Sequence, residues 1–294
     1  MKRLKVDLAT ATKNLRVLTS SLVNTKFIGS YRSVFRGKGL EFRDYRQYTP
    51  DDDAASIDWK ATVRSKKTLI KEFEEERNLN VFFLVDASSS MLLSSTPKLK
   101  SEYAAEIVAS LSRAILESGD NVGFALFTDR PMKSVLPDRG TKQFYILSET
   151  IVDISLYGGK FDLGEALKFL IGSLSAGTLV MIVSDFITSN NWEQYLQIAA
   201  RKFGIIGVMI RDPTDRALPK ISGRVIVSDP FSNNAMLIEP NLIRERFAKY
   251  VKEEERKIKD AFVKNNSDFL ELTTDVPFLE PLTKFFKMRE LRLR

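Results

Sequence analysis

A short polar loop follows a continuously apolar segment of this chain and carries side chains that could hold a cation. Residues 81–85 are apolar and strand-sized, and Asp86, Ser88 and Ser90 come directly after them. The aspartate would supply charge, and the two serines would supply neutral hydroxyl oxygens on one side of the loop. A divalent cation with few carboxylate ligands stays under-neutralised, so it can take a further acidic ligand from a partner. A second acidic residue, Asp185, ends another apolar segment.

The composition restricts the chemistry of such a site. The sequence contains neither cysteine nor histidine. Disulfides, thiolate nucleophiles, Ser-His-Asp triads and imidazole-based zinc sites are therefore excluded. Any metal must be held by oxygen, which favours Mg²⁺, Mn²⁺ or Ca²⁺. We expect Mg²⁺ or another divalent cation at Asp86, Ser88, Ser90 and Asp185.

The elements that must position these residues alternate between strands and helices from Leu79 onward. The apolar strands are continuous, which indicates burial on both faces and a mostly parallel sheet flanked by helices. Ligands of such sheets bind at the carboxyl ends of the strands, where the strand order reverses. The predicted strands are 81–85, 122–127, 178–184, 205–210 and 224–228, and the predicted helices are 98–118, 142–156, 162–174, 191–203 and 241–264, with a further helix near Asp275.

The segments before and after this alternation have their own patterns. Residues 8–26 have helical periodicity, and residues 30–78 predict short strands and turns in which Trp59 is a core anchor. Near the C-terminus, Asp275 is a candidate N-cap. These patterns divide the chain into an N-terminal helix and irregular annex (1–78), an α/β domain (79–235) and C-terminal helices (236–294). Within the annex, we expect ion pairs between basic and acidic side chains: Arg43, Arg46 and Lys60 with Asp51, Asp52, Asp53 and Asp58. In the last helix, we expect three apolar side chains to face inward: Phe278, Leu282 and Phe285.

Two motifs resemble known families. The D-x-S-x-S loop at Asp86 is similar to the metal-ion-dependent adhesion site (MIDAS) of von Willebrand factor A domains. The block over residues 37–62 (GKGLEFRDYRQYTPDDD, then IDWKAT) closely resembles the prokaryotic domain-of-unknown-function fifty-eight family, a von Willebrand A-type group. With C-terminal matches such as Arg211-Asp212-Pro213, this resemblance covers residues 29–290. It implies a Rossmann-like von Willebrand factor A fold and an adaptor that partners a MoxR-type AAA+ ATPase in chaperone-like assembly or metal insertion.

One ligand of the adhesion site is missing. The family's loop reads Gly-Gly-Thr-Asp-Leu, but here Phe161 stands in the threonine position before Asp162, and phenylalanine cannot coordinate a cation. Asp162 could rotate in, water could fill the gap, or the Lys160 ammonium could take the cation's space and pair with Asp86 or Asp185. We therefore expect weak or no Mg²⁺ binding unless Phe161 is replaced by threonine. Ser89, Lys160 and Phe161 are the candidate partner contacts.

Binding is the favoured function, and no catalytic residue is assigned. One alternative is a Mg²⁺-dependent phosphohydrolase with Asp86 as nucleophile, although Ser88 stands where such enzymes carry a second acid. Another is a nucleic-acid or membrane-surface binder using the basic tail 284–294, although we expect its apolar residues to pack on the body while its basic groups remain solvated. The net charge of +7 is spread among interspersed acidic groups, which favours a solvated surface over a specific nucleic-acid site. No phosphate-binding P-loop, secretory signal or membrane-spanning run is visible, so we expect a cytoplasmic protein.

Overall fold

A computed structural model describes residues 3–6, 41–49, 52–53, 57–65, 67–74, 78–188, 191–232 and 234–292. The chain forms two compact units. One comprises Met1–Phe27 and Leu79–Arg294, and the other comprises Ile28–Asn78. The helix predicted over residues 8–26 lies outside the described residues.

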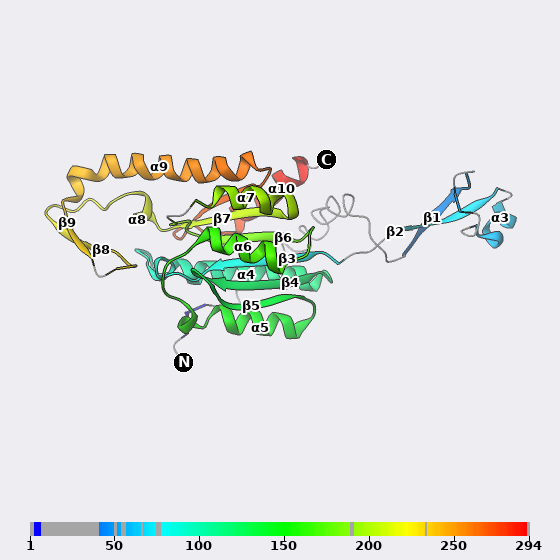
Figure 1. Cartoon of the computed structure of the whole chain (residues 1–294), viewed down its shortest axis with the longest axis horizontal. Helices are drawn as coiled ribbons and strands as arrows, with labels where there is room; N and C mark the ends of the chain where they lie inside the picture. Colours follow the sequence, from blue (N-terminus) through cyan, green and yellow to red (C-terminus); the bar gives the residue numbers. More distant parts are fainter. Residues whose placement is uncertain are drawn as a thin grey trace. The chain divides into compact units, whose positions relative to one another are not determined.

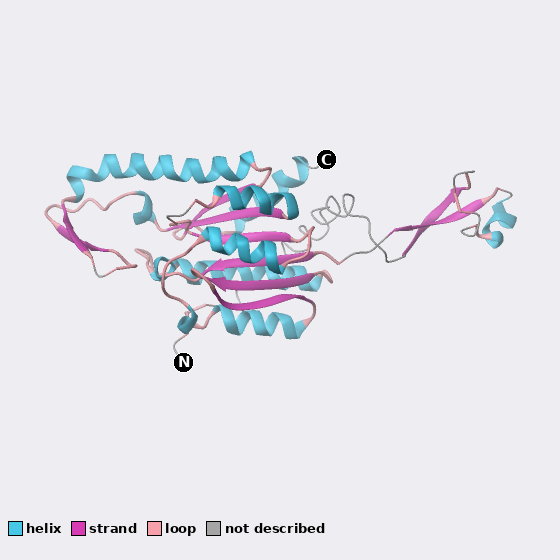
Figure 2. Cartoon of the chain, viewed as in Figure 1, coloured by secondary structure: helices cyan, strands magenta, loops and turns pink. Residues whose placement is uncertain are grey.

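A six-stranded sheet organises the larger unit (Figures 1 and 2). Every neighbouring pair is parallel except β4–β5, which is antiparallel. This arrangement confirms the α/β class and the mostly parallel sheet. In spatial order the strands are β10 (Asp268–Thr273), β7 (Gly204–Arg211), β6 (Leu179–Ser184), β3 (Asn80–Asp86), β4 (Asn121–Phe127) and β5 (Pro131–Asp138).

Helices cover both faces of the sheet, as continuous apolar strands require. Helices α6 and α7 lie over one face, and α4 lies behind the sheet in Figure 1. Burial is complete along β6 and nearly complete along β3 and β7. The helices are α4 (Lys100–Glu117), α5 (Thr141–Ile151), α6 (Leu163–Ser173), α7 (Glu193–Lys202), the short α8 (Pro213–Arg216), α9 (Pro240–Lys264) and α10 (Leu279–Arg292).

The C-terminal segment differs from the prediction of helices alone. It contributes β10, an edge strand of the main sheet. Helix α10 begins at Leu279, so Asp275 is not its N-cap. Leu282 and Phe285 are buried as predicted, and the ring of Phe278 packs edge-on against Tyr103. The basic end of α10 contacts strand β10, because Arg289 and Arg292 both form ion pairs with Asp268.

A two-stranded hairpin follows β7 and α8. It consists of β8 (Val225–Ser228) and β9 (Ala235–Ile238), which pair antiparallel. Figure 1 places it beyond the edge at which the parallel strands end. The hairpin is apolar in sequence yet largely exposed along both strands.

The smaller unit pairs β1 (Glu41–Gln47) with β2 (Leu69–Glu74) and carries the short helix α3 (Trp59–Ser65). Arg46 pairs with Asp52, as predicted. The prediction for Trp59 is wrong: its side chain is 67% exposed, because α3 is too short and too polar to bury a face. Asp58 caps α3 by accepting the backbone N–H groups of Lys60 and Ala61.

None of the helices within the described ranges has the length and hydrophobicity needed to cross a bilayer.

Candidate functional site

The candidate site lies where the strand order of the main sheet reverses. Strand β3 is flanked by β4 on one side and β6 on the other, so the chain changes direction across the sheet at this point. Asp86 ends β3 and Asp185 follows β6, and both side chains are completely buried. The two carboxylates therefore share the sheet edge at which parallel sheets bind ligands.

Both oxygens of Asp86 accept hydrogen bonds. The Ser88 amide donates to Oδ1 at 2.8 Å, and the Ser184 hydroxyl donates to Oδ2 at 2.6 Å. Burial, followed by the nearby charge of Asp185, raises the pKa of Asp86 to about 7. A carboxyl in this setting resists ionisation because the low-dielectric interior disfavours charge.

The loop that carries Ser88, Ser89 and Ser90 packs against the end of β3. Ser88 and Ser90 are buried, and their hydroxyl oxygens lie 3.0 Å apart, within hydrogen-bond distance. The partly exposed Ser89 donates its amide to the carbonyl of Gly159 at 2.9 Å. The amide of Gly158 donates to the carbonyl of Ala87 at 2.7 Å. The loops after β3 and before α6 are thus joined by backbone hydrogen bonds.

Asp185 is held by a strained turn. The next residue, Phe186, has φ of 54°, a left-handed conformation that is uncommon for a bulky residue. The turn is fixed by the amide of Ile187, which donates to Asp185 Oδ1 at 3.1 Å, and by the aromatic packing of Phe186 on Phe262. Strain of this kind persists where the surrounding structure determines the backbone, and it is frequent at functional sites.

A lysine that the sequence analysis did not identify completes the cluster. Lys100, the first residue of α4, is only 1% exposed. Its ammonium donates to Asp185 Oδ2 at 2.8 Å and to Asp215 Oδ2, in α8, at 2.9 Å. Burial lowers the pKa of Lys100, but the charges and hydrogen bonds of the two aspartates outweigh burial and raise it above its ordinary value. The ammonium is therefore a permanent charge of the site.

The three residues of the loop before α6 occupy different environments. Phe161 is 4% exposed and lies in the main core cluster, so little of its side chain is accessible to a partner. Asp162 is the N-cap of α6, where its Oδ1 accepts the Glu165 amide at 3.0 Å. Lys160 is exposed and does not fill the cation's space; Lys100 is the lysine that pairs with Asp185.

Hydrogen bonds from Ser232 and the Phe231 amide lower the pKa of Asp229, and the charge of nearby Lys160 lowers it further.

The side chains that meet at this site are poorly arranged to bind a divalent cation. All four carboxylate oxygens of Asp86 and Asp185 already accept hydrogens from protein groups. The Lys100 ammonium bound to Asp185 would repel a second cation, and Phe161 offers no oxygen. Within the described ranges, no group of three or more acidic side chains is arranged to hold a metal ion.

Asp212, which directly follows β7, organises the neighbouring loops. It accepts hydrogen bonds from the hydroxyls of Ser94 and Ser95 and from the amides of Ser95 and Thr214. Burial raises the pKa of Asp212, but the hydrogen bonds from Ser95 and Thr214 outweigh burial and hold it well below the ordinary value. The Asp212 amide in turn donates to Asp215 Oδ2, so this cluster is continuous with Lys100.

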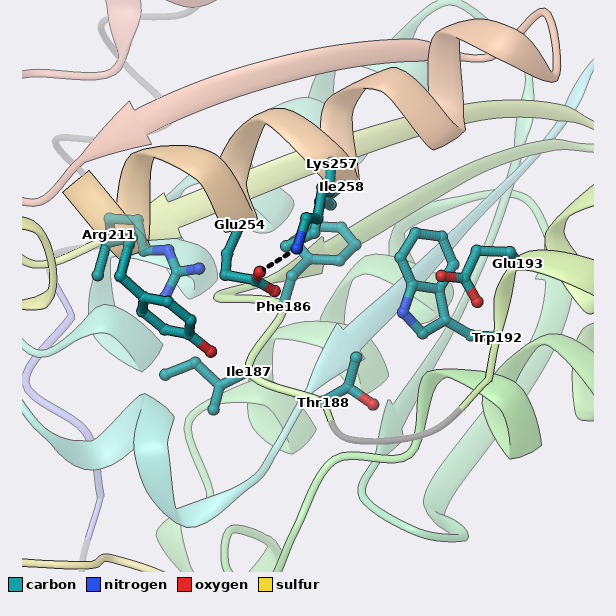
Figure 3. Close-up of a pocket in the computed structure, with 11 residues that line it drawn as sticks. Phe186, Ile187, Thr188, Trp192, Glu193, Arg211, Glu254, Lys257 and Ile258 are labelled. Carbon is teal, nitrogen blue, oxygen red and sulfur yellow. Dashed lines mark hydrogen bonds and ion pairs between the residues drawn. The ribbon is translucent and has the colours of Figure 1, made fainter. Parts of the chain in front are cut away.

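A pocket of about 270 Å³ lies beside the site, between the segment after Asp185 and helix α9 (Figure 3). Its lining is mixed. Phe186, Trp192 and Ile258 supply apolar surface, and the Lys257–Glu254 ion pair closes one side. The charged groups around it are balanced, so the pocket indicates no single class of ligand.

Comparisons with known proteins give a family and several distant likenesses. A protein of Mycobacterium tuberculosis, described as uncharacterised, is 24% identical over 286 residues, which are 96% of this chain and 90% of the relative. The uncharacterised protein YeaD of Bacillus subtilis is 34% identical over 80 residues, 27% of this chain and 18% of YeaD. Among solved structures, the conserved hypothetical protein BatB of Bacteroides thetaiotaomicron has a TM-score of 0.45 at 13% identity, covering 73% of this chain and 100% of BatB.

The SpRpn10 VWA domain has a TM-score of 0.34 at 12% identity and covers 46% of this chain and 77% of its own. The family described as "Protein of unknown function DUF58" matches residues 44–257, most of the chain, in agreement with the resemblance at residues 37–62. This protein belongs to the DUF58 family.

Proposed function

We propose that this chain is a protein-interaction module that docks a partner at the carboxyl edge of its main sheet, and that it is not an enzyme. The observation that carries the proposal is the exposed apolar hairpin β8–β9 beside the candidate site. Ile226 and Leu237 are paired on one face of the hairpin and are 72% and 57% exposed. Val227 and Met236 are paired on the opposite face and are 46% and 68% exposed. A two-stranded ribbon is marginally stable alone, and contiguous exposed apolar surface is typical of interaction sites.

Lys160, in the loop before α6, lies near enough to the hairpin for its charge to act there. The charge of Lys160 acts on Asp229, which follows β8, so the exposed lysine lies close to the turn of the hairpin. A partner segment that offers apolar side chains to the hairpin and an acidic group to Lys160 matches this surface. The family resemblance implies an AAA+ ATPase of the MoxR type as that partner.

The buried cluster beneath this surface supports binding over hydrolysis. A carboxylate nucleophile must reach the substrate, but Asp86 is fully buried and both of its oxygens accept hydrogen bonds. Its position suits a residue that fixes loop geometry. We therefore propose that Asp86, Ser88 and Ser90 shape the docking surface from below, and that Ser89 and Lys160 lie at that surface.

The test measures binding of a purified MoxR-type AAA+ ATPase from the same organism by surface plasmon resonance. We expect Ile226→Thr/Leu237→Thr and Lys160→Glu each to weaken binding by at least about tenfold, because the first removes the apolar part of the surface and the second reverses its charge. The matched controls are Leu136→Thr, an exposed strand position, and Lys142→Glu, an exposed lysine, both toward the opposite edge of the sheet. Equal affinity for all five proteins would exclude this edge as the docking site.

A further inference from the structure

We propose that the Lys100 ammonium is the resident cation of the candidate site, so that the D-x-S-x-S loop is organised without a divalent metal. This inference concerns the site's own charges and does not depend on the proposed docking function. It rests on the contacts of Lys100, which join three segments of the larger unit.

The first support is charge balance at close range. The Lys100 ammonium lies 2.8 Å from one oxygen of Asp185 and 2.9 Å from one oxygen of Asp215. Asp185 is 0% exposed and the Lys100 side chain 1%, so water screens this pair poorly. A cation is needed there because a buried carboxylate without one is strongly destabilising. Lys100 supplies that cation from within the chain.

The second support is the position of the ammonium in the fold. Lys100 begins α4, Asp185 follows β6, and Asp215 belongs to α8 after β7. Asp215 Oδ2 also accepts the amide of Asp212 at 2.9 Å. The ammonium therefore links the segments that follow two neighbouring strands to the start of a helix. A metal ion bound between loops would cross-link them in the same way.

The third support is that the remaining oxygens of the site already have hydrogen-bond partners within the protein. The Ser88 and Ser90 hydroxyls contact each other, and each oxygen of Asp86 already accepts a hydrogen bond. A divalent cation would have to share these oxygens with their hydrogen-bond donors and approach the ammonium held by Asp185. Replacing Phe161 alone would not remove that repulsion, so Phe161→Thr alone is expected to bind no Mg²⁺.

The experiment compares thermal unfolding of the full chain in excess EDTA, in Mg²⁺ and in Mn²⁺. For the wild type we expect the same Tm in all three conditions. Lys100→Met removes the charge and keeps a long side chain. We expect it to lower the Tm by about 5–10 °C in EDTA and to recover part of that loss when metal is added. The control Lys98→Met removes a partly exposed lysine that pairs with Glu106 and should remain insensitive to metal.

Two further variants keep the test decisive if Lys100→Met folds poorly. Lys100→Met/Asp185→Asn removes both members of the buried pair, so it should be more stable than Lys100→Met and indifferent to metal. Phe161→Thr should show no heat of Mg²⁺ binding by calorimetry. A metal-induced rise in the Tm of the wild type, calorimetric Mg²⁺ binding by Phe161→Thr, or a Lys100→Met variant as stable in EDTA as the wild type would each overturn the proposal.

Discussion

At the residue scale, Asp86 and Asp185 could be predicted from the sequence, whereas Lys100 and its second partner Asp215 could not. Asp86 and Asp185 each follow a continuous apolar strand, and parallel strands bring such residues to a common edge. Lys100 has no comparable local signal. A lysine in the first turn of a predicted helix is ordinarily solvated, and its partners Asp185 and Asp215 are 85 and 115 positions away. Only the packed topology shows that it is buried.

Asp212 provides a residue-scale prediction about pH. We expect Asp212→Asn to lower the free energy of unfolding by about 3 kcal/mol at neutral pH, because several donors lose a charged acceptor. The folded-state pKa of Asp212 lies below its unfolded value of about 4. Its contribution is therefore fully present above pH of about 4 and is lost as the pH falls further toward the folded pKa.

Urea unfolding of the wild type and of Asp212→Asn across this pH range checks the prediction. The difference between the two proteins should be constant above about pH 5 and should shrink in more acidic buffer. Asp260→Asn, which alters an exposed aspartate of α9, is the control and should have little effect. A difference that grows on acidification would show that Asp212 is not stabilised as the carboxylate.

At the element scale, the sequence predicted the buried parallel strands well and the edge strands poorly. Strands β3, β4, β6 and β7 agree with prediction to within one or two residues at each end. Strand β5 was not predicted because it begins with proline, has another proline near its end and is mostly exposed. The short β10 follows a long helix and is only partly buried. Edge strands bury one face or less, so their sequences lack the continuous apolar run.

The packing of β7 under α9 and beside β10 gives an element-scale prediction. A Cβ on Gly207 would lie 2.6 Å from the ring of Phe269 and 2.9 Å from the ring of Phe262. We expect Gly207→Ala to lower the free energy of unfolding by about 1–3 kcal/mol, because overpacking pushes α9 and β10 away from β7. Gly172→Ala in α6 meets nothing within 4 Å and should raise that free energy by about 0.5–1 kcal/mol. Chemical denaturation measures both, and equal signs would refute this account.

At the scale of the whole molecule, the block that identified the family and the candidate site belong to different compact units. The block, residues 37–62, lies in the unit formed by Ile28–Asn78, which has its own β1–β2 pair, the Arg46–Asp52 ion pair and helix α3. The core cluster and the buried aspartates belong to the other unit. The sequence motif of highest specificity therefore indicates family membership and does not by itself locate the site.

This separation gives a prediction for the whole chain. Replacement of residues 28–78 by a flexible Gly/Ser linker of about 20 residues, which spans roughly 25 Å on average, should leave the larger unit folded. We expect its cooperative thermal transition and its far-UV circular dichroism per residue to persist, because every strand of the main sheet is retained.

If the carboxyl edge is the docking surface, the shortened protein should also bind the AAA+ ATPase within about threefold of the wild-type affinity, a difference of under 1 kcal/mol. A folded shortened protein that no longer binds would move the docking surface to the smaller unit, whereas loss of the thermal transition would show that the larger unit depends on the smaller one to fold.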